Sequence, residues 1–338
     1  AEWSCSKPVE IEHGYVEHLI KYHCNPYYKL SNSGDGEACH GHSTHAFLAP
    51  WGCPMLDSPA PTIFLRGTSG CIPLTHQGPA LLCAVCGKPK NPPMQMQRII
   101  GGLLARKGSF PWQGRLITHH NLTTGATLIS DQWLLTTGRN VYLNHREDAK
   151  PEEIAPTLKL FLGTQEQPAL DIERVVLHPS YPGSVDLALL KLKQKVLLGE
   201  EVMPICLAKK DYVRPGRVGY ISGWGRGATF AFPKMLKYAM LPVAEGEKCR
   251  QYYEARNGSN WVQPILSNDT FCVGMSELRE DTCYGDAGGA FAVQDSDDDT
   301  WYAAGILSYD KTCSASKYSV YVDVQRVLSW VKETIASG

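Results

Sequence analysis

Twelve cysteines divide this 338-residue chain into two parts that must be stabilised differently. Seven lie within the first 86 residues, at Cys5, Cys24, Cys39, Cys53, Cys71, Cys83 and Cys86. The other five are spread over the second half, at Cys206, Cys249, Cys272, Cys283 and Cys313. Small modules bury too little core to fold alone and are held by disulfides instead. The cysteines therefore predict a small disulfide-bonded module followed by a domain of ordinary size.

Three potential N-glycosylation sequences support an oxidising, extracellular setting: Asn121, Asn257 and Asn268. A formal charge of -1 gives no general attraction to nucleic acid or to an anionic membrane. No apolar run reaches the roughly 18 residues of a membrane span. The chain opens without a signal peptide, as a mature secreted protein would. We therefore expect a secreted protein that binds neither nucleic acid nor membrane.

Zinc binding is an alternative explanation for some of the first cysteines. Candidate ligands lie close together at Cys39, His40, His42 and His45, and Cys83 and Cys86 form a C-x-x-C. Neither a second C-x-x-C nor a helical H-x-x-x-H completes a tetrahedral site. We therefore favour disulfides, and we expect no metal and no cofactor.

A change in composition marks the domain boundary. The N-terminal third is rich in proline, glycine and histidine without sustained periodicity, which predicts loops and short strands. The polar segment KPKNPPMQMQR (88–98) follows, and the apolar run IIGG (99–102) comes directly after it. We predict a module over 1–87, a linker over 88–98 and a larger domain over 99–338.

Short β-branched and aromatic segments recur beyond the linker, between turn residues. They are KLFLGT (159–164), ERVVLHP (173–179), DLALLKL (186–192), VGYISGW (218–224), LKYAMLPV (236–243), WYAAGILSY (301–309) and YSVYVDV (318–324). Many short strands favour a sandwich or barrel. In the tail, apolar residues recur at helical spacing: Val324, Val327, Leu328, Val331 and Ile335. The pattern predicts an all-β domain with one closing amphipathic helix.

Six motifs resemble those of the chymotrypsin-type serine protease domain in order and spacing. They are RIIGG (98–102), GSFPWQ (108–113), GATLISDQWLLTT (125–137), DLALL (186–190), SGWG (222–225) and DTCYGDAGG (281–289). The resemblance covers residues 99–338. It implies a double six-stranded β-barrel with a C-terminal helix, in agreement with the strand and helix pattern.

The resemblance places Arg139, Asp186 and Ala287 where active relatives have a catalytic triad. Arg139 replaces the histidine base, and a guanidinium offers only donors, so it cannot accept a proton near neutral pH. Ala287 replaces the serine nucleophile and carries no hydroxyl. We therefore expect a protease homologue that is not an enzyme. Asp186 would be a structural anion in a buried, charge-assisted pair with Arg139.

Other positions of the protease frame are retained. Asp286 matches the carboxylate that, in the resembled family, pairs with the N-terminus created by cleavage. A cut after Arg98 would free Ile99 for that contact. The alternative is that Arg98 is an ordinary cation of an uncleaved linker. Asp281 matches the floor of a specificity pocket for basic residues, which would be vestigial here.

Two further differences surround the expected site. Tyr309 and Asp310 replace the tryptophan-glycine that borders the substrate in active relatives. A bulky charged residue there would hinder an extended peptide. Thr124 and Asn140 stand where active relatives have a disulfide, which is consistent with relaxation around a site that has lost its chemistry.

More segments resemble a non-catalytic, haemoglobin-binding branch of this family that circulates in plasma. They are HGYVEH (13–18), YYKL (27–30), AVCGKPKNP (84–92), HHNLTTGATLI (119–129), IAPTLKL (154–160), VMPIC (202–206), GRVGY (216–220) and EDTCYGDAG (280–288). In that branch, complement-control (sushi) modules precede the protease-like domain, and the first residues here resemble one. Residues 37–82 lack its strand pattern and its ending. We interpret them as a disordered insert or a gene-model artefact, with a genuine variant of the module as the alternative.

The resemblance also implies how the cysteines pair. The pairs are Cys24–Cys83, Cys86–Cys206, Cys249–Cys272 and Cys283–Cys313, of which the second would tie the module to the domain. Cys5 would link two copies into a homodimer, or an internal bridge, for instance to Cys71, would occupy it. The loop between Cys249 and Cys272 is shorter and less lysine-rich than the one through which some members meet a macrophage scavenger receptor, which argues against that partner.

These features favour a carrier that captures free haemoglobin and so limits loss of haem iron and oxidative damage. Two alternatives come from other functional classes. One is an active trypsin-like hydrolase with an unconventional base and nucleophile, against which Arg139 and Ala287 argue. The other is a zymogen-like decoy that binds proteases.

Overall fold

The computed structural model describes residues 28–30, 82–84, 86–93, 103–142, 145–146, 148–163, 168–225, 235–255, 263–274, 286–310 and 317–338. Several residues singled out by the sequence lie outside these ranges: Cys5, Cys24, Cys39, Cys53, Cys71, Arg98, Ile99, Asn257, Asp281, Cys283 and Cys313. The same holds for nearly all of the segment 37–82. Most of the described residues therefore belong to the larger domain.

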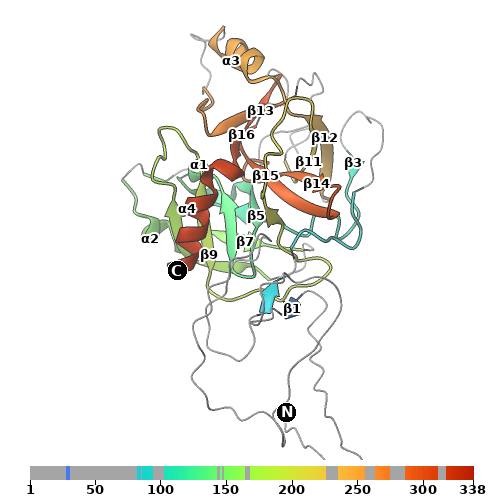
Figure 1. The fold of residues 1–338 in the computed structure, drawn as a ribbon. Helices are drawn as coiled ribbons and strands as arrows, with labels where there is room; N and C mark the ends of the chain where they lie inside the picture. Colours follow the sequence, from blue (N-terminus) through green and yellow to red (C-terminus); the bar gives the residue numbers. More distant parts are fainter. Residues whose placement is uncertain are drawn as a thin grey trace, which may run out of the picture. The chain divides into compact units, whose positions relative to one another are not determined.

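The chain divides into two units, Ala1–Cys83 and Ala84–Gly338. In the first part of the chain, β1 (Tyr28–Leu30) pairs with β2 (Leu82–Ala84) in a two-stranded sheet. The second unit contains the remaining described strands and helices, and its strands form two barrels (Figure 1).

The first barrel is closed and six-stranded. Its order is β4-β5-β6-β9-β8-β7, from β4 (Gln113–Ile117), β5 (Thr123–Leu128), β6 (Trp133–Thr136), β7 (Lys159–Phe161), β8 (Leu170–Leu177) and β9 (Ala188–Leu192). All neighbouring strands are antiparallel. Leu116, Leu134, Leu160 and Leu190 are fully buried. Such apolar interiors supply most of the stabilisation of a barrel this small.

The second barrel is built from the last six long strands. It comprises β11 (Val218–Gly223), β12 (Lys237–Pro242), β13 (Thr270–Val273), β14 (Ala290–Asp295), β15 (Thr300–Tyr309) and β16 (Ser319–Asp323), with β3 (Leu103–Leu104) beside β12 and β10 (Cys206–Leu207) beside β15. A bridge between Val243 and Val273 connects the end of β12 to β13 and closes the sheet. Inside, the rings of Phe271 and Phe291 pack on Tyr321, with centroids 5.4 and 5.5 Å away.

The helices are short except at the C-terminus. They are η1 (His119–Asn121), α1 (Gly138–Tyr142), α2 (Pro151–Ile154), η2 (Ala155–Thr157), α3 (Gly246–Glu254) and α4 (Val324–Ala336). The Asp323 side chain caps α4 by accepting a hydrogen bond from the backbone N–H of Gln325. From β16, α4 reaches the first barrel, where Trp330 meets the His178 ring at 4.8 Å (Figure 1).

The predicted fold class is confirmed: an all-β double barrel with a C-terminal helix. The predicted strand segments correspond to β7, β8, β9, β11, β12, β15 and β16. Four of the five predicted apolar residues of α4 are buried, and Leu328 is half-buried. The sequence pattern did not resolve β4, β5, β6, β13 and β14. Short apolar runs such as WLLT in β6 fit a strand or a buried helix turn equally well.

Residues 86–88 belong to the second unit, although we assigned them to the first module and the linker. A Cys86–Cys206 disulfide joins this segment to β10. The backbone of Gly87 donates to Pro204 O and accepts from Trp301 N, both at 2.8 Å. Lys88 donates to the carbonyl oxygen of Asp299 at 2.8 Å. The segment is therefore fixed to the domain covalently and by backbone hydrogen bonds.

A buried carboxylate organises the turn between β14 and β15. Asp295 is 2% exposed and accepts hydrogen bonds from the Tyr212 hydroxyl at 2.7 Å and from the Lys210 ammonium. Burial raises the pKa of Asp295, but the bonds from Tyr212, the Asp297 N–H and Lys210 outweigh it and hold that pKa well below its usual range. Charge-assisted hydrogen bonds to Asp295 thus fix the turn whose Asp299 carbonyl group accepts from Lys88.

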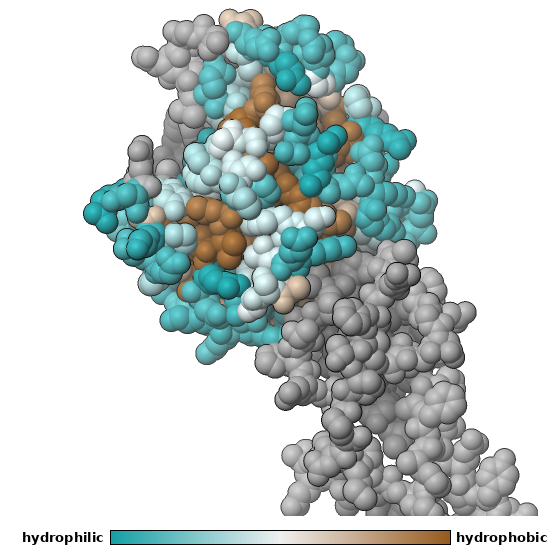
Figure 2. All heavy atoms as spheres, turned by 60° about the vertical axis from the view of Figure 1, so that its left-hand side comes forward, coloured by the Kyte–Doolittle hydropathy of each residue, from teal (hydrophilic) through white to brown (hydrophobic). Residues whose placement is uncertain are grey.

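The face shown in Figure 2 carries both hydrophilic and hydrophobic side chains. In the view of Figure 2, hydrophobic areas are separated by hydrophilic side chains. Among the described residues, the large hydrophobic side chains that are exposed are Leu104, Leu197, Val218 and Met235. No helix in the described part of the chain is long and apolar enough to span a membrane.

Cleavage of the chain after Arg98 should leave its two parts covalently joined, because Cys86 is bonded to Cys206. Gels of cleaved protein should show one band without reductant and two with it. The Cys86→Ser variant is the control, and should release the light fragment without reductant. A light fragment released from the unreduced wild type would contradict the bond.

Asp295→Asn should destabilise the second unit by about 2 kcal/mol, since it replaces a charged acceptor by a neutral one. The melting temperature should fall by roughly 4–8 °C. Because folding lowers the pKa of Asp295, its stabilisation is complete above the unfolded-state pKa near ~4 and is lost as the pH falls below it. Calorimetry should therefore show a smaller difference at acidic pH. The exposed Asp297→Asn variant should change stability little.

Candidate functional site

The three expected triad positions meet where the two barrels join. Arg139 lies in α1, directly after β6, and Asp186 precedes β9 in the same barrel. Ala287 precedes β14 of the second barrel. The backbone N–H of Arg139 donates to Asp186 Oδ1 at 2.9 Å, and Asn140 in α1 donates to Ala287 O at 2.8 Å. One hydrogen-bonded network therefore holds all three positions.

The GDAGG turn is packed against β5 and β15 through its backbone. Gly125 N donates to Ala287 O at 2.8 Å, and Gly288 N donates to Leu307 O at 2.7 Å. Gly288 has a φ of +93°, and an added Cβ would lie 2.0 Å from Gly125 O. A side chain is excluded at Gly288 by both its conformation and the contact. Gly288 is thus required by packing, whether or not a nucleophile is present.

Polar contacts replace the disulfide that active relatives have beside this turn. Asn140 Nδ2 donates to Ala287 O at 2.8 Å and to Thr136 Oγ1 at 3.3 Å. Thr124 Oγ1 makes a long contact of 3.5 Å to Leu116 O. From the sequence we interpreted Thr124 and Asn140 as consistent with relaxation around the site. In the structure, the Asn140 side chain bonds α1 to the turn.

Asp186 is buried and hydrogen-bonded, but its contacts differ from those we expected. Its side chain is 5% exposed, whereas that of Arg139 is 39% exposed. Arg139 Nε lies 3.9 Å from Asp186 Oδ2, which is too long for a hydrogen bond. The carboxylate accepts instead from the Arg139 N–H and from Ser308 Oγ, both at 2.9 Å. We expected a buried, hydrogen-bonded pair, but the partly exposed Arg139 and the buried Asp186 form an ion pair at 3.9 Å.

The environment of Asp186 pulls its pKa in two directions. Burial raises the pKa of Asp186. The Arg139 charge and hydrogen bonds from Arg139 N, Ser308 and Gly138 N lower it without cancelling the effect of burial. These donors satisfy a carboxylate that has no imidazole to orient.

The Arg139 side chain contacts the end of β15. Its Nη2 donates to the carbonyl oxygen of Ser308, and its guanidinium carbon lies 5.5 Å from the centre of the Tyr309 ring. Tyr309 is buried and meets Tyr253 edge to face. Sequence reasoning missed Ser308, although it directly precedes the two residues that we had singled out.

Two aspartates flank Ala287 in space. Asp310 Oδ2 accepts a hydrogen bond from Ala287 N at 3.3 Å. Asp286 is 8% exposed, and its Oδ1 accepts from Gly225 N at 2.7 Å. The expected contact between Asp286 and Ile99 involves a residue outside the described ranges, as does the pocket floor at Asp281.

This arrangement offers support but no reactive group. Arg139 presents donors where a base must accept a proton, and Ala287 presents a methyl group where a nucleophile must attack. Asp186 is enclosed by donors on both oxygens, and Asp310 accepts a hydrogen bond from Ala287 N. Arg139 and Ala287 therefore supply neither a base nor a nucleophile at the triad positions.

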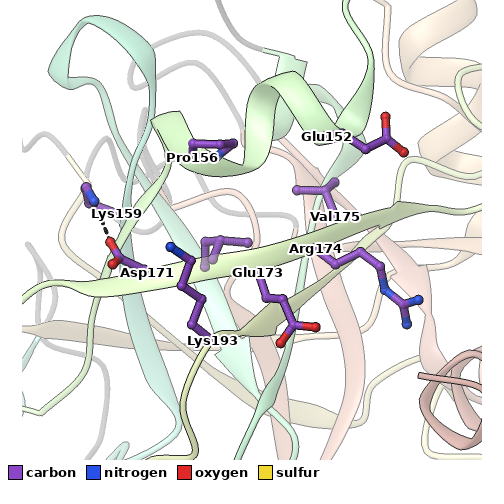
Figure 3. A pocket seen from close by; sticks show the side chains of 9 residues that line it. Glu152, Pro156, Lys159, Asp171, Glu173, Arg174, Val175 and Lys193 are labelled. Carbon is purple, nitrogen blue, oxygen red and sulfur yellow. Dashed lines mark hydrogen bonds and ion pairs between the residues drawn. The ribbon is translucent and has the colours of Figure 1, made fainter.

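A pocket of about 240 Å³ lies elsewhere on the first barrel, beside α2 and β8 (Figure 3). Its charged side chains have opposite signs, and Lys159 is bonded to Asp171. Neither Arg139 nor Ala287 lines it, so it adds nothing to the triad positions. Within the described ranges, no group of three or more His, Cys, Asp or Glu side chains could hold a metal ion.

The structure also locates other predicted residues. Cys249 and Cys272 form a disulfide between α3 and β13. Asn121 at the end of η1 and Asn268 before β13 are exposed, as a glycan acceptor must be. Both remain predicted glycosylation sites.

Ala287→Ser alone should give no measurable peptidase activity, because the new hydroxyl has a donor, Arg139, in place of a base. Loss of one triad member costs about 10⁶-fold in turnover in a related mechanism. Adding Arg139→His should restore weak cleavage of an arginine ester, with Asp186 fixing the imidazole tautomer. Peptides should remain poor substrates beside Tyr309 and Asp310. Robust peptide cleavage by the single variant would contradict this assignment of the site.

Comparison with known proteins agrees with this geometry. The family model described as Trypsin matches residues 99–331. Haptoglobin of Canis lupus familiaris is 52% identical over 345 residues, which cover 100% of this chain and 97% of the relative. Haptoglobin of Sus scrofa is 51% identical, covering 99% and 91%, and that of Homo sapiens is 50% identical, covering 100% and 79%. The chain therefore belongs to the haptoglobin family, in which its second unit is a trypsin domain.

Proposed function

We propose that this protein is a non-catalytic carrier that captures free haemoglobin in plasma. The observation that carries the proposal is identity of about half of all positions to haptoglobins over essentially the whole chain. Capture would limit the loss of haem iron and oxidative damage. It would use the surface of the trypsin domain, since binding between proteins needs complementary surface and not a catalytic centre.

The site supports a role without catalysis. A hydrolase needs a base and a nucleophile, and Arg139 and Ala287 supply neither. The surrounding frame is nevertheless intact, because the hydrogen bonds of Asp186 and the GDAGG turn hold the two barrels together. A protein selected for its surface would keep such a frame while its chemistry was lost.

The same observations weigh against the two alternatives. An active hydrolase would need another base and another nucleophile within reach of bound substrate, because neither Arg139 nor Ala287 can take these roles. A decoy for proteases would have to present a segment that enters a protease active site. The 50–52% identity to haptoglobins favours the carrier over both.

The proposal includes the setting and the assembly of the protein. Disulfides at Cys86–Cys206 and Cys249–Cys272, with exposed acceptors at Asn121 and Asn268, fit a secreted glycoprotein. Cys5 would link two copies as a homodimer. The short loop between Cys249 and Cys272 supports a carrier with reduced affinity for a macrophage scavenger receptor.

Size-exclusion chromatography with haemoglobin tests the carrier function. The full chain should shift haemoglobin to an earlier elution volume at micromolar concentration. A trypsin with its nucleophile replaced by alanine has the same fold and should leave haemoglobin unshifted. If the full chain leaves it unshifted as well, the carrier proposal is wrong.

A second experiment tests whether haemoglobin binds at the outer surface or at the triad positions. The variant Arg139→His with Ala287→Ser should bind haemoglobin as the wild type does, because the proposed contact is the outer surface. A loss of binding in this folded variant would place haemoglobin at the triad positions instead.

A further inference from the structure

We infer that Arg139 and Asp310 cap the two backbone groups by which this site would hold an extended peptide, so that the site excludes peptide ligands. The inference is independent of haemoglobin binding. It rests on two hydrogen bonds, Arg139 to Ser308 O and Ala287 N to Asp310. Ser308 lies near the end of β15, and Asp310 directly follows that strand.

The first cap lies on the carbonyl group of Ser308, where the register of the sheet shifts. The pairing of β14 with β15 begins at Ala290 and Ile306, and that of β15 with β16 shifts between Leu307 and Tyr309. Ser308 therefore has no partner in register on either neighbouring strand. An extended peptide binds a sheet by donating its N–H groups to such carbonyls. Arg139 Nη2 donates to Ser308 O in its place.

The second cap lies on the backbone N–H of Ala287. In acyl transfer, the N–H of the residue at the nucleophile position stabilises the carbonyl oxygen under attack. Here that N–H donates to Asp310 Oδ2 at 3.3 Å. A carboxylate in this place takes the donor and also repels any oxyanion that forms beside it. Asp310 therefore opposes both a bound carbonyl group and its reaction.

The two caps support one another through β15. Ser308 accepts from Arg139 with its carbonyl group and donates to Asp186 with its hydroxyl. Between the capped residues, Tyr309 is 6% exposed and its ring lies beneath the Arg139 guanidinium. The Arg139 cation thus takes the Ser308 acceptor, and the Asp310 anion takes the Ala287 donor. A bound peptide would otherwise fill these places with its N–H and C=O groups.

Binding of a rigid, substrate-like inhibitor tests the inference directly. The probe is a Kunitz-type inhibitor with arginine at the centre of its reactive loop, which needs backbone contacts and no nucleophile. The wild-type full chain should not bind it. Arg139→Ala and Asp310→Gly should each strengthen binding about 10- to 100-fold, because each frees one charge-capped backbone group. The double variant should bind most tightly.

A matched control uses the same two substitutions elsewhere. Arg146 and Asp148 form an exposed ion pair, so Arg146→Ala with Asp148→Gly should leave inhibitor binding absent. Melting curves check that every variant is folded. Binding by the wild type would overturn the inference, and so would a folded double variant that binds no better than the wild type.

Amide hydrogen exchange provides a readout without any ligand. Asp310→Gly should increase the exchange rate at Ala287 about tenfold or more, while Asp310→Asn, which keeps an acceptor, should largely preserve protection. Gly288 N donates to Leu307 O and should remain protected in both variants. An unchanged rate at Ala287 in Asp310→Gly would show that the cap does not exist.

Discussion

The buried carboxylate of Asp186 is the contact on which the rest of the site depends. It accepts from the backbone of α1 in the first barrel and from Ser308 in the second, at 2.9 Å in each case. A buried anion that lost these donors would cost several kcal/mol. The barrels must therefore meet in one orientation, which also fixes the positions of Arg139, Tyr309 and Ala287. The site keeps its shape because Asp186 must be satisfied, although no imidazole is present for it to orient.

Arg139 and Asn140, which differ from the residues of active proteases, make hydrogen bonds within this network. A guanidinium at position 139 reaches past Asp186 to the Ser308 carbonyl and the Tyr309 ring. An amide at position 140 bonds α1 to the GDAGG turn. The result is a junction between barrels that is held by polar contacts and has neither an imidazole at position 139 nor a hydroxyl at position 287. Such a junction suits a protein that works through its surface.

Much of this could be predicted from the chain because it depends on local pattern and ordered motifs. Short β-branched and aromatic segments located β15 and β16, helical spacing located α4, and the motif series placed Arg139, Asp186 and Ala287. The pattern failed for β4 to β6, whose short buried runs do not distinguish strand from helix. Ser308 and Asn140 were missed as donors because their partners lie 122 and 147 residues away in the chain.

The sequence by itself determined the chemistry that is lost, since alanine has no hydroxyl and arginine no free acceptor in any fold. It also determined the double-barrel class and the cysteines that can pair. Tertiary structure alone decided what the replacement residues do. The Arg139 side chain is 39% exposed and that of Asp186 is 5% exposed, and their charged atoms lie 3.9 Å apart. Asp186 accepts a hydrogen bond from the Arg139 backbone, and the Arg139 side chain donates to the Ser308 backbone. That choice depends on distances of a few tenths of an ångström between segments far apart in sequence, which packing of the two barrels sets and no local pattern encodes.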